Sequence, residues 1–307
     1  MANKTLTIAI VTKKRPDKLR RCLESVVQQT TPPDWVLIID NDPAMSAKKT
    51  CTEFINALPI QYLLDKRPGV SNARNTALTL SNTKYLGFVD DDCILDKKWV
   101  ENCLNIVRRK RNICYVCGKT KLYNTKNLCA IAQQVHDSYW LTKKINSKNE
   151  LLSGGIDTKN LILFRHEIVA RKLRFDSKCS IKNFDSADLD FGLQLTQQHL
   201  KGIYSSNLIV YHEETSKFNR YVMRGYYRGK IAAYVNQKWN LRNSLANIPD
   251  SSILRWAFRK VKNLPKDLKL YTSKMKLPLI YKIMIGLTIA LYEGAYIKGY
   301  RDFKYEK

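Results

Sequence analysis

The stretch YLGFVDDDCILDKKW, residues 85–99, joins a mostly apolar run to three consecutive aspartates. Tyr85–Val89 has the composition of a buried strand, and residues 96–109 carry apolar side chains at helical spacing. Adjacent carboxylates repel one another, so Asp90–Asp92 carries an electrostatic cost that a bound cation would remove. The stretch therefore predicts a strand, an acidic turn and a helix, with a candidate cation site at the turn.

Strand-like and helix-like segments also alternate through the residues before this stretch. Apolar strand-like runs lie at residues 5–12, 35–40 and 60–64, and helix-like segments begin near Pro16 and Ser71. This alternation is typical of an α/β fold with a mostly parallel sheet, in which ligands bind at the carboxyl ends of strands. We expect one shared rim for the polar clusters that end three of these strands, Thr12–Arg15, Asp40–Asp42 and Asp90–Asp92.

The pattern is weaker after residue 110. A glycine turn leads into an apolar run over Gly154–Phe164. A helix with an acidic first turn is predicted for Asp185–Gly202 and a strand for Ser206–Glu214, which places His212 near a strand end.

The eight cysteines are scattered along the chain. Cys114 and Cys117 form a CxxC, but they lie in a strand-like run, where residues three apart point to opposite faces. No second pair completes a zinc set, so the sequence predicts buried free thiols. Free thiols and the lack of a signal peptide indicate a cytoplasmic protein.

The net charge of +26 favours anionic partners such as phosphorylated substrates or an acidic membrane surface. Residues 217–307 hold 20 Lys and Arg against 5 Asp and Glu. No nucleic-acid-binding motif accompanies this charge, so we predict no nucleic acid partner. The alternative, suggested by the charge alone, is a nucleic-acid-binding protein.

The most apolar late segment, Leu277–Tyr300, is interrupted by Lys282 and Glu293. Its uncharged run is shorter than the ~20 residues that a transmembrane helix needs. Because basic residues flank it on both sides, we predict a peripheral protein on the cytoplasmic face of the cell membrane, held by anionic lipid. The alternative is that the segment packs against the rest of the protein.

The oxygen ligands of Asp90–Asp92 suit Mg²⁺ or Mn²⁺. The alternative is a solvated helix start, with Asp92 or Asp96 as the N-cap.

Several segments in order resemble glycosyltransferase family 2, whose enzymes have a GT-A fold and move a sugar from a nucleotide donor to an acceptor hydroxyl. The resemblance covers roughly residues 5–229, and its later part is similar to bacterial enzymes that build surface polysaccharides. It is carried by the segments VTKKRPDKLRRCLESVVQQ, VLIIDNDP, RPGVSNARNTAL, YLGFVDDDCILDKKWV, LRFDSKCSIKNFDSADLDFGLQL and VYHEETSKFNRYVMRGYYRG. It implies a Rossmann-like, mostly parallel sheet between helices, with residues 217–307 as a basic helical extension. The catalytic domain would comprise residues 1–216, with a donor half over about 1–118 and an acceptor half over about 119–216.

The resemblance also implies roles for individual residues. Asp188 is the expected catalytic base, with Asp185 and Asp190 as alternatives; Ala187 precedes it where the family usually has Glu, and Gln194 stands where it often has Arg. The expected metal ligands for Mg²⁺ or Mn²⁺ are Asp92, Asp90 and His212. The expected donor-binding residues are Thr12, Arg15, Asp40, Asp42, Arg67, Arg74, Asp90 and Asp91. The expected acceptor-binding residues are Gly154, Gly155 and Asn160.

The sequence thus predicts a metal-dependent, inverting glycosyltransferase that acts on a glycan or lipid-linked acceptor. A sugar nucleotidyltransferase is the first alternative, but the glycine-rich phosphate loop of such enzymes is absent after the first strand, where VTKKRPDKLR stands. Another alternative is a membrane adaptor without catalysis, but the presence of Asp90–Asp92 and Asp188 argues against it.

Overall fold

The computed structural model describes residues 5–110, 112–124, 126–152, 155–182, 184–241 and 278–305. They divide into two compact units. The first unit contains Met1–Tyr123, Lys143–Ser180 and Ala187–Glu213. The second contains Asn124–Thr142, Ile181–Ser186 and Glu214–Lys307.

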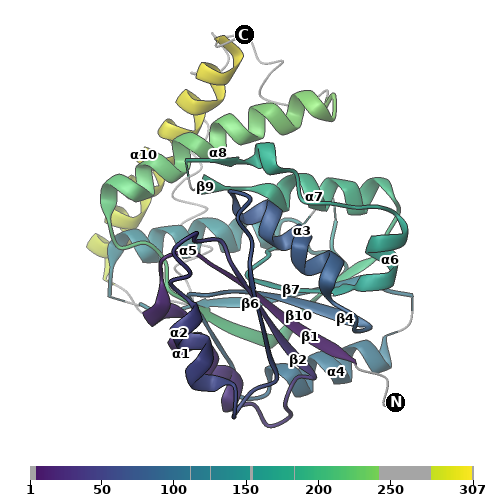
Figure 1. Ribbon diagram of the computed structural model, residues 1–307. Coiled ribbons are helices and arrows are strands. Elements are labelled where there is room, and N and C mark those ends of the chain that lie inside the picture. Colours follow the sequence, from purple (N-terminus) through teal and green to yellow (C-terminus); the bar gives the residue numbers. More distant parts are fainter. Residues whose placement is uncertain are drawn as a thin grey trace. The chain divides into compact units, whose positions relative to one another are not determined.

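The first unit is built on an eight-stranded sheet in the order β3-β2-β1-β4-β7-β6-β10-β5 (Figure 1). Its strands are β1 (Leu6–Thr12), β2 (Trp35–Asp40), β3 (Ile60–Leu64), β4 (Tyr85–Asp90), β5 (Cys93–Leu95), β6 (Tyr115–Leu122), β7 (Asn160–Phe164) and β10 (Gly202–His212). β1 pairs in parallel with β2 and β4, β2 with β3, and β6 with β10, whereas β7 and β5 run antiparallel to their neighbours. The predicted α/β fold with a mostly parallel sheet is confirmed.

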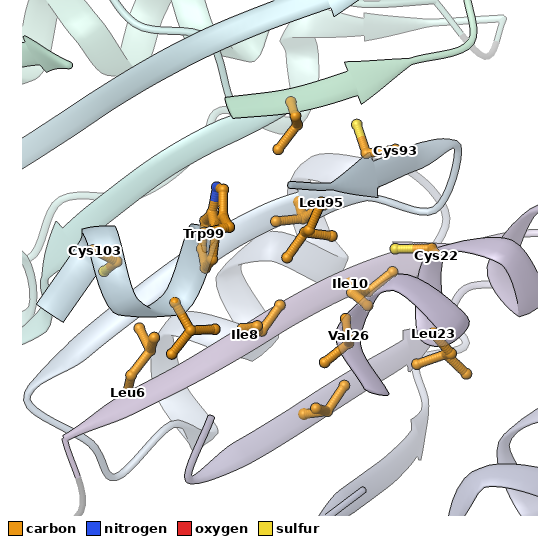
Figure 2. Packing of buried hydrophobic residues seen from close by; sticks show 14 of the residues in the cluster. Leu6, Ile8, Ile10, Cys22, Leu23, Val26, Cys93, Leu95, Trp99 and Cys103 are labelled. Atoms are coloured by element: carbon orange, nitrogen blue, oxygen red, sulfur yellow. The ribbon is translucent and has the colours of Figure 1, made fainter. Parts of the chain in front are cut away.

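The helices of this unit cover both faces of the sheet, with α1 and α4 on one side in Figure 1 and α3, α6 and α7 on the other. They are α1 (Pro16–Val27), α2 (Lys48–Phe54), α3 (Val70–Leu80), α4 (Trp99–Arg109), α6 (Arg165–Ala170) and α7 (Ala187–Gln197), with a 3₁₀ turn, η1, at Ser177–Cys179. Figure 2 shows the apolar side chains of α1, α4 and β5 meeting those of β1. Burial of this cluster gives the sheet one continuous hydrophobic layer.

Three predicted elements have different bounds in the structure. The helix expected over 96–109 begins at Trp99, because Asp96–Lys98 form a turn in which the Asp96 side chain accepts a hydrogen bond from the Lys98 backbone. The helix expected over 185–202 covers only Ala187–Gln197, and Asp185 lies in the short strand β9 (Phe184–Asp185), which pairs with β8 (Ser180–Ile181). β10 begins at Gly202, four residues before the predicted start, and contains a bulge between Ser205 and Ile209.

In its described residues, the second unit has the helices α5 (Leu128–Thr142), α8 (Phe218–Lys238) and α10 (Leu279–Tyr305). α8 and α10 approach closely at glycines: a Cβ on Gly229 would lie 1.9 Å from the carbonyl oxygen of Tyr296, and one on Gly299 would lie 1.8 Å from that of Tyr226. Only glycine permits this backbone approach.

α10 was expected to be too interrupted to span a membrane. It forms one continuous helix, and by length and composition its Leu279–Phe303 segment could cross one; 28% of its most apolar window is buried in the protein. The buried side chains lie on one side of the helix, and large apolar side chains remain exposed on the other.

Candidate active site

The carboxyl ends of three adjacent parallel strands form one polar edge of the sheet. In the strand registers Thr12 of β1 lies opposite Asp40 of β2, and Val11 lies opposite Asp90 of β4. The polar clusters that follow these strands are therefore neighbours, as predicted.

Asp40 is fully buried, and its carboxylate organises the loop after β2. It accepts hydrogen bonds from the backbone N–H groups of Asp42 and Ala47, each at 3.0 Å, and from the Tyr62 hydroxyl at 3.0 Å. Burial and the adjacent Asp40 carboxylate raise the pKa of Tyr62. Asp42 in turn accepts a hydrogen bond from the Ala44 backbone at 3.3 Å. These hydrogen bonds fix the loop at the carboxyl edge of the sheet.

Arg67 is held by Asp65, a site residue that the sequence analysis missed. The Arg67 guanidinium donates through Nε and Nη2 to the two Asp65 oxygens, at 3.0 and 2.9 Å. Asn41, which the sequence places in the polar cluster Asp40–Asp42 without an assigned role, ties the same loops together by donating to the Asp65 and Arg67 carbonyls at 2.8 and 2.6 Å. Both follow predicted strands directly, and that position was the only signal in the sequence.

Arg74 of α3 lies beside Asp90, with Nη2 3.3 Å from Oδ1. The Arg74 side chain is buried, and its guanidinium carbon lies 5.6 Å from the centre of the Phe175 ring. A cation held against an aromatic face keeps a fixed position.

Asp91 points into the protein and is fully buried. It accepts a hydrogen bond from the Thr12 hydroxyl at 2.7 Å and pairs with Arg15 Nη2 at 3.0 Å. Burial raises the pKa of Asp91 to about 7, although Arg15 opposes that shift. Asp91 therefore anchors the turn, while its two neighbours present their carboxylates elsewhere.

Asp92 is surrounded by basic side chains. Its Oδ1 lies 3.1 Å from His212 Nε2 and its Oδ2 lies 2.8 Å from Arg15 Nη1 and 3.6 Å from Lys18 Nζ. Burial opposes ionisation, but His212 and then Arg15 and Lys18 outweigh it and hold the pKa of Asp92 far below its usual range. Lys18 and Arg21 also pair with Glu213, the residue after β10.

The residues around Asp92 fit a divalent cation. Asp92, Cys93 and His212 each offer one ligand atom, and these atoms lie within 4.8 Å of one another. Carboxylate oxygen and imidazole nitrogen are common ligands of Mn²⁺ and of other first-row metals. Asp90, which the sequence analysis also assigned to the metal, pairs with Arg74 and is not part of this ligand group among the described residues.

Asp188 lies in the first turn of α7 and is half-buried, with its Oδ1 accepting from the Leu189 backbone at 2.9 Å. Its rival Asp190 is fully buried and accepts from Gln194 at 2.8 Å. Gln194 also bonds the Arg174 backbone, so it fills a structural position. Asp185, the other rival, belongs to the second unit.

The residues expected to contact the acceptor have mixed positions. Gly154 lies outside the described residues, and Gly155 is buried. Asn160 is fully buried in β7: its Oδ1 accepts from Trp99 Nε1 at 2.9 Å, and its Nδ2 donates to the Leu208 carbonyl at 2.8 Å. This amide joins β7 to α4 and β10 inside the protein, so its observed role is structural.

The sheet order and the acidic turn at its carboxyl edge define a GT-A fold, the fold class of nucleotide-sugar-dependent glycosyltransferases. The chain belongs to glycosyl transferase family 2, whose model matches residues 7–171. The family expected from the sequence motifs is thus confirmed.

Two bacterial relatives resemble short parts of the chain. Glycosyltransferase GlyA of Streptococcus pneumoniae is 28% identical over 97 residues, which are 31% of this chain and 14% of GlyA. The amylovoran biosynthesis glycosyltransferase AmsE of Erwinia amylovora is 30% identical over 92 residues, 29% of this chain and 35% of AmsE. The chain thus matches well under half the length of these curated relatives.

Two solved structures share the fold over nearly the whole chain. The mannosyltransferase PcManGT from Pyrobaculum calidifontis, in complex with GDP-Man and Mn²⁺, has a TM-score of 0.63 at 14% identity, covering 98% of this chain and 87% of PcManGT. TarS 1–349 of S. aureus, in complex with UDP, has a TM-score of 0.56 at 12% identity, covering 96% and 92%.

Proposed function

We propose that this protein transfers a sugar from a nucleoside-diphosphate sugar to a hydroxyl of a glycan or lipid-linked acceptor, with inversion, in the synthesis of a bacterial surface polysaccharide. The observation that carries the proposal is the acidic turn after β4, where Asp92 and His212 lie 3.1 Å apart beside Arg15 and Lys18. Family membership and the similarity to the glycosyltransferases GlyA and AmsE, the latter named for amylovoran biosynthesis, support the reaction class.

The donor would bind along the carboxyl edge of the sheet. Asp40 and Asp42 border the site for the base, and Arg15, Lys18 and Arg74 supply positive charge for the diphosphate, which guanidinium groups bind well. Asp92 and His212 would hold Mg²⁺ or Mn²⁺, which would neutralise charge on the leaving diphosphate. Arg67, which is paired with Asp65 and is more exposed than Arg15 or Arg74, is a further candidate for the diphosphate.

Asp188 would accept the proton of the acceptor hydroxyl. We favour Asp188 over Asp190 as the base because Asp188 is partly exposed, whereas Asp190 is fully buried and accepts a hydrogen bond from Gln194. A carboxylate general base removes the hydroxyl proton as the oxygen attacks the anomeric carbon from the face opposite the diphosphate, which gives inversion.

The test is a panel of nucleotide-sugars assayed for binding and for slow hydrolysis, with Mg²⁺, with Mn²⁺ and with EDTA. At least one nucleotide-sugar should bind and hydrolyse only when metal is present. Binding of none of them, with or without metal, would contradict the proposed function.

We also propose that the protein sits on the cytoplasmic face of the cell membrane through α10. This helix buries Ile285, Ile289 and Tyr292 within the second unit. Its other side leaves six large apolar residues exposed by 42 to 73%: Leu279, Ile280, Ile283, Met284, Leu287 and Leu291.

An anionic membrane suits this side of α10 because the same helix exposes Lys298 and Arg301 and the chain carries a net charge of +26. An apolar helix face combined with basic residues is the usual device of peripheral attachment. The flanking Lys260, Lys262, Lys266, Lys269, Lys274 and Lys276, on which the sequence prediction also relied, lie outside the described residues.

A further inference from the structure

We propose that Cys93 is a third protein ligand of the cation held by Asp92 and His212, and that its thiolate shifts the metal preference of the site toward Zn²⁺ and Co²⁺ and away from Mg²⁺. The inference rests on the proposed metal-dependent function. Its starting point is the antiparallel pairing of β5 with β10, in which Cys93 lies directly opposite His212. Directly opposed residues project from the same face of a sheet, so this register brings the thiol beside the imidazole.

The distances suit a shared metal ion. Asp92 Oδ1 and His212 Nε2 are 3.1 Å apart. Two ligands about 2.1 Å from one tetrahedral metal lie about 3.4 Å apart, so this pair is already spaced for one ion. The Cys93 sulfur lies within 4.8 Å of a carboxylate oxygen of Asp92 and of a ring nitrogen of His212, so all three side chains could reach one ion.

The thiol is buried and only weakly engaged. Cys93 is 1% exposed, and the contact of its sulfur with the Lys159 carbonyl is long, at 3.9 Å. Figure 2 shows Cys93 at one end of β5, with its sulfur turned away from the labelled side chains of α1. Metal binding would form the metal–sulfur bond and release the thiol proton to solvent.

The ligand chemistry decides which metals bind well. Mg²⁺ requires oxygen ligands in near-octahedral geometry, whereas thiolate and imidazole suit Zn²⁺ and Co²⁺. A set of one oxygen, one nitrogen and one sulfur with an open position resembles a catalytic zinc site more closely than a magnesium site. Cys93 would therefore strengthen the preference for Zn²⁺ and Co²⁺ that the imidazole of His212 already favours, while the Asp92 carboxylate suits any divalent cation.

The test is a Co²⁺ titration of the full chain, followed by absorption. A cysteine ligand gives a thiolate-to-cobalt charge-transfer band in the near ultraviolet, and the band should be present in the wild type and absent in Cys93→Ser. Zn²⁺ affinity, measured by competition, should fall at least about tenfold in Cys93→Ser, with Mg²⁺ affinity little changed.

Cys22→Ser is the matched control. Cys22 is also fully buried near the acidic turn, where its sulfur contacts the Asp90 carbonyl at 3.7 Å, but it is not a member of the ligand group. This variant should keep the band.

The outcomes separate the two proposals. Co²⁺ binding without the band, or a band that survives in Cys93→Ser, would overturn the role of Cys93 and leave the metal site standing. No Co²⁺ binding to the wild type, with or without UDP or GDP, would overturn the metal site and the proposed metal-dependent transfer together.

Discussion

Asp92 ionises in a buried position because His212, Arg15 and Lys18 surround it. These basic groups, together with Arg74 beside Asp90, offset the repulsion among the three consecutive carboxylates. Asp91 is paired with Thr12 and Arg15, and Asp90 with Arg74, so each aspartate is paired and Arg15 is shared between Asp91 and Asp92.

Asp92→Asn should abolish metal-dependent binding of nucleoside diphosphate while the fold is retained. The amide keeps the shape of the carboxylate but removes the charge that attracts the cation. Calorimetric titration with UDP and GDP in the presence of Mn²⁺ measures this, and Asp17→Asn, at an exposed position in the first turn of α1, is the control. Equal binding by wild type in Mn²⁺ and in excess EDTA would contradict the prediction.

Asp188→Asn should lower turnover by about 10²- to 10⁴-fold, the usual contribution of a positioned general base, with donor binding nearly unchanged. Initial rates at saturating donor and the donor dissociation constant provide the two readouts. If Asp188→Asn is nearly as active as wild type and a folded Asp190→Asn is inactive, Asp190 is the base instead.

At the scale of elements, the second unit depends on close helix packing. Gly225, Gly229 and Gly299 each lie against the backbone of the facing helix.

On another side of α10, His136 of α5 lies between two carboxylates, with Nε2 3.1 Å from Glu293 and Nδ1 3.5 Å from Asp137. Asp137 is also paired with Arg228 of α8, so one network links all three helices.

Gly229→Ala should destabilise the protein by about 1–3 kcal/mol, the usual cost of overpacking, because its Cβ would lie 1.9 Å from the Tyr296 carbonyl oxygen. Gly294→Ala is the matched control in α10: a Cβ there meets nothing within 4 Å, and alanine favours a helix by up to about 1 kcal/mol. Chemical denaturation gives both free energies of unfolding. Equal stability of the two variants would mean that α8 and α10 do not approach as described.

His136→Gln should make stability less dependent on pH. Burial lowers the pKa of His136, but Asp137 and Glu293 outweigh it, so the folded pKa is raised above the unfolded value of about 6.5. The stabilisation is then fully present below about pH 6.5 and is lost as the pH rises through the folded pKa. Melting temperatures of wild type and variant should differ most at acidic pH and converge at alkaline pH; a gap that widens with pH would contradict the prediction.

At the scale of the whole molecule, the excess positive charge and the apolar side of α10 predict membrane attachment. The full chain should sediment with anionic vesicles at low salt and be released at high salt, because salt screens exposed charges. Neutral vesicles should retain much less of it.

The variant Leu287→Glu/Leu291→Glu should lose this sedimentation, because both residues are exposed on α10 and glutamate preserves the helix. Ile55→Glu, at an equally exposed apolar residue of the first unit, should sediment like wild type. Wild type that remains in the supernatant with anionic vesicles at low salt would refute the attachment.

The sequence by itself determined four of the strands and three of the helices in the first 110 residues, the acidic turn and the family, but not α2 or β5. Those features depend on local patterns: a short continuous apolar run such as Trp35–Asp40 is typical of a strand that is buried on both faces of a parallel sheet. Strand ends are local too, so the polar rim could be predicted from Thr12, Asp40 and Asp90.

The tertiary structure alone decided which polar groups meet at that rim. The pairing of Thr12 with Asp91, the burial of Asn160 and the register of Cys93 with His212 depend on segments brought together by folding. Cys93 and His212 are far apart in the chain, and β5 is too short for its partner to be inferred from its composition. Side-chain identity shows what a residue can bind, but strand pairing and burial determine which atoms lie close enough to bind the same ion.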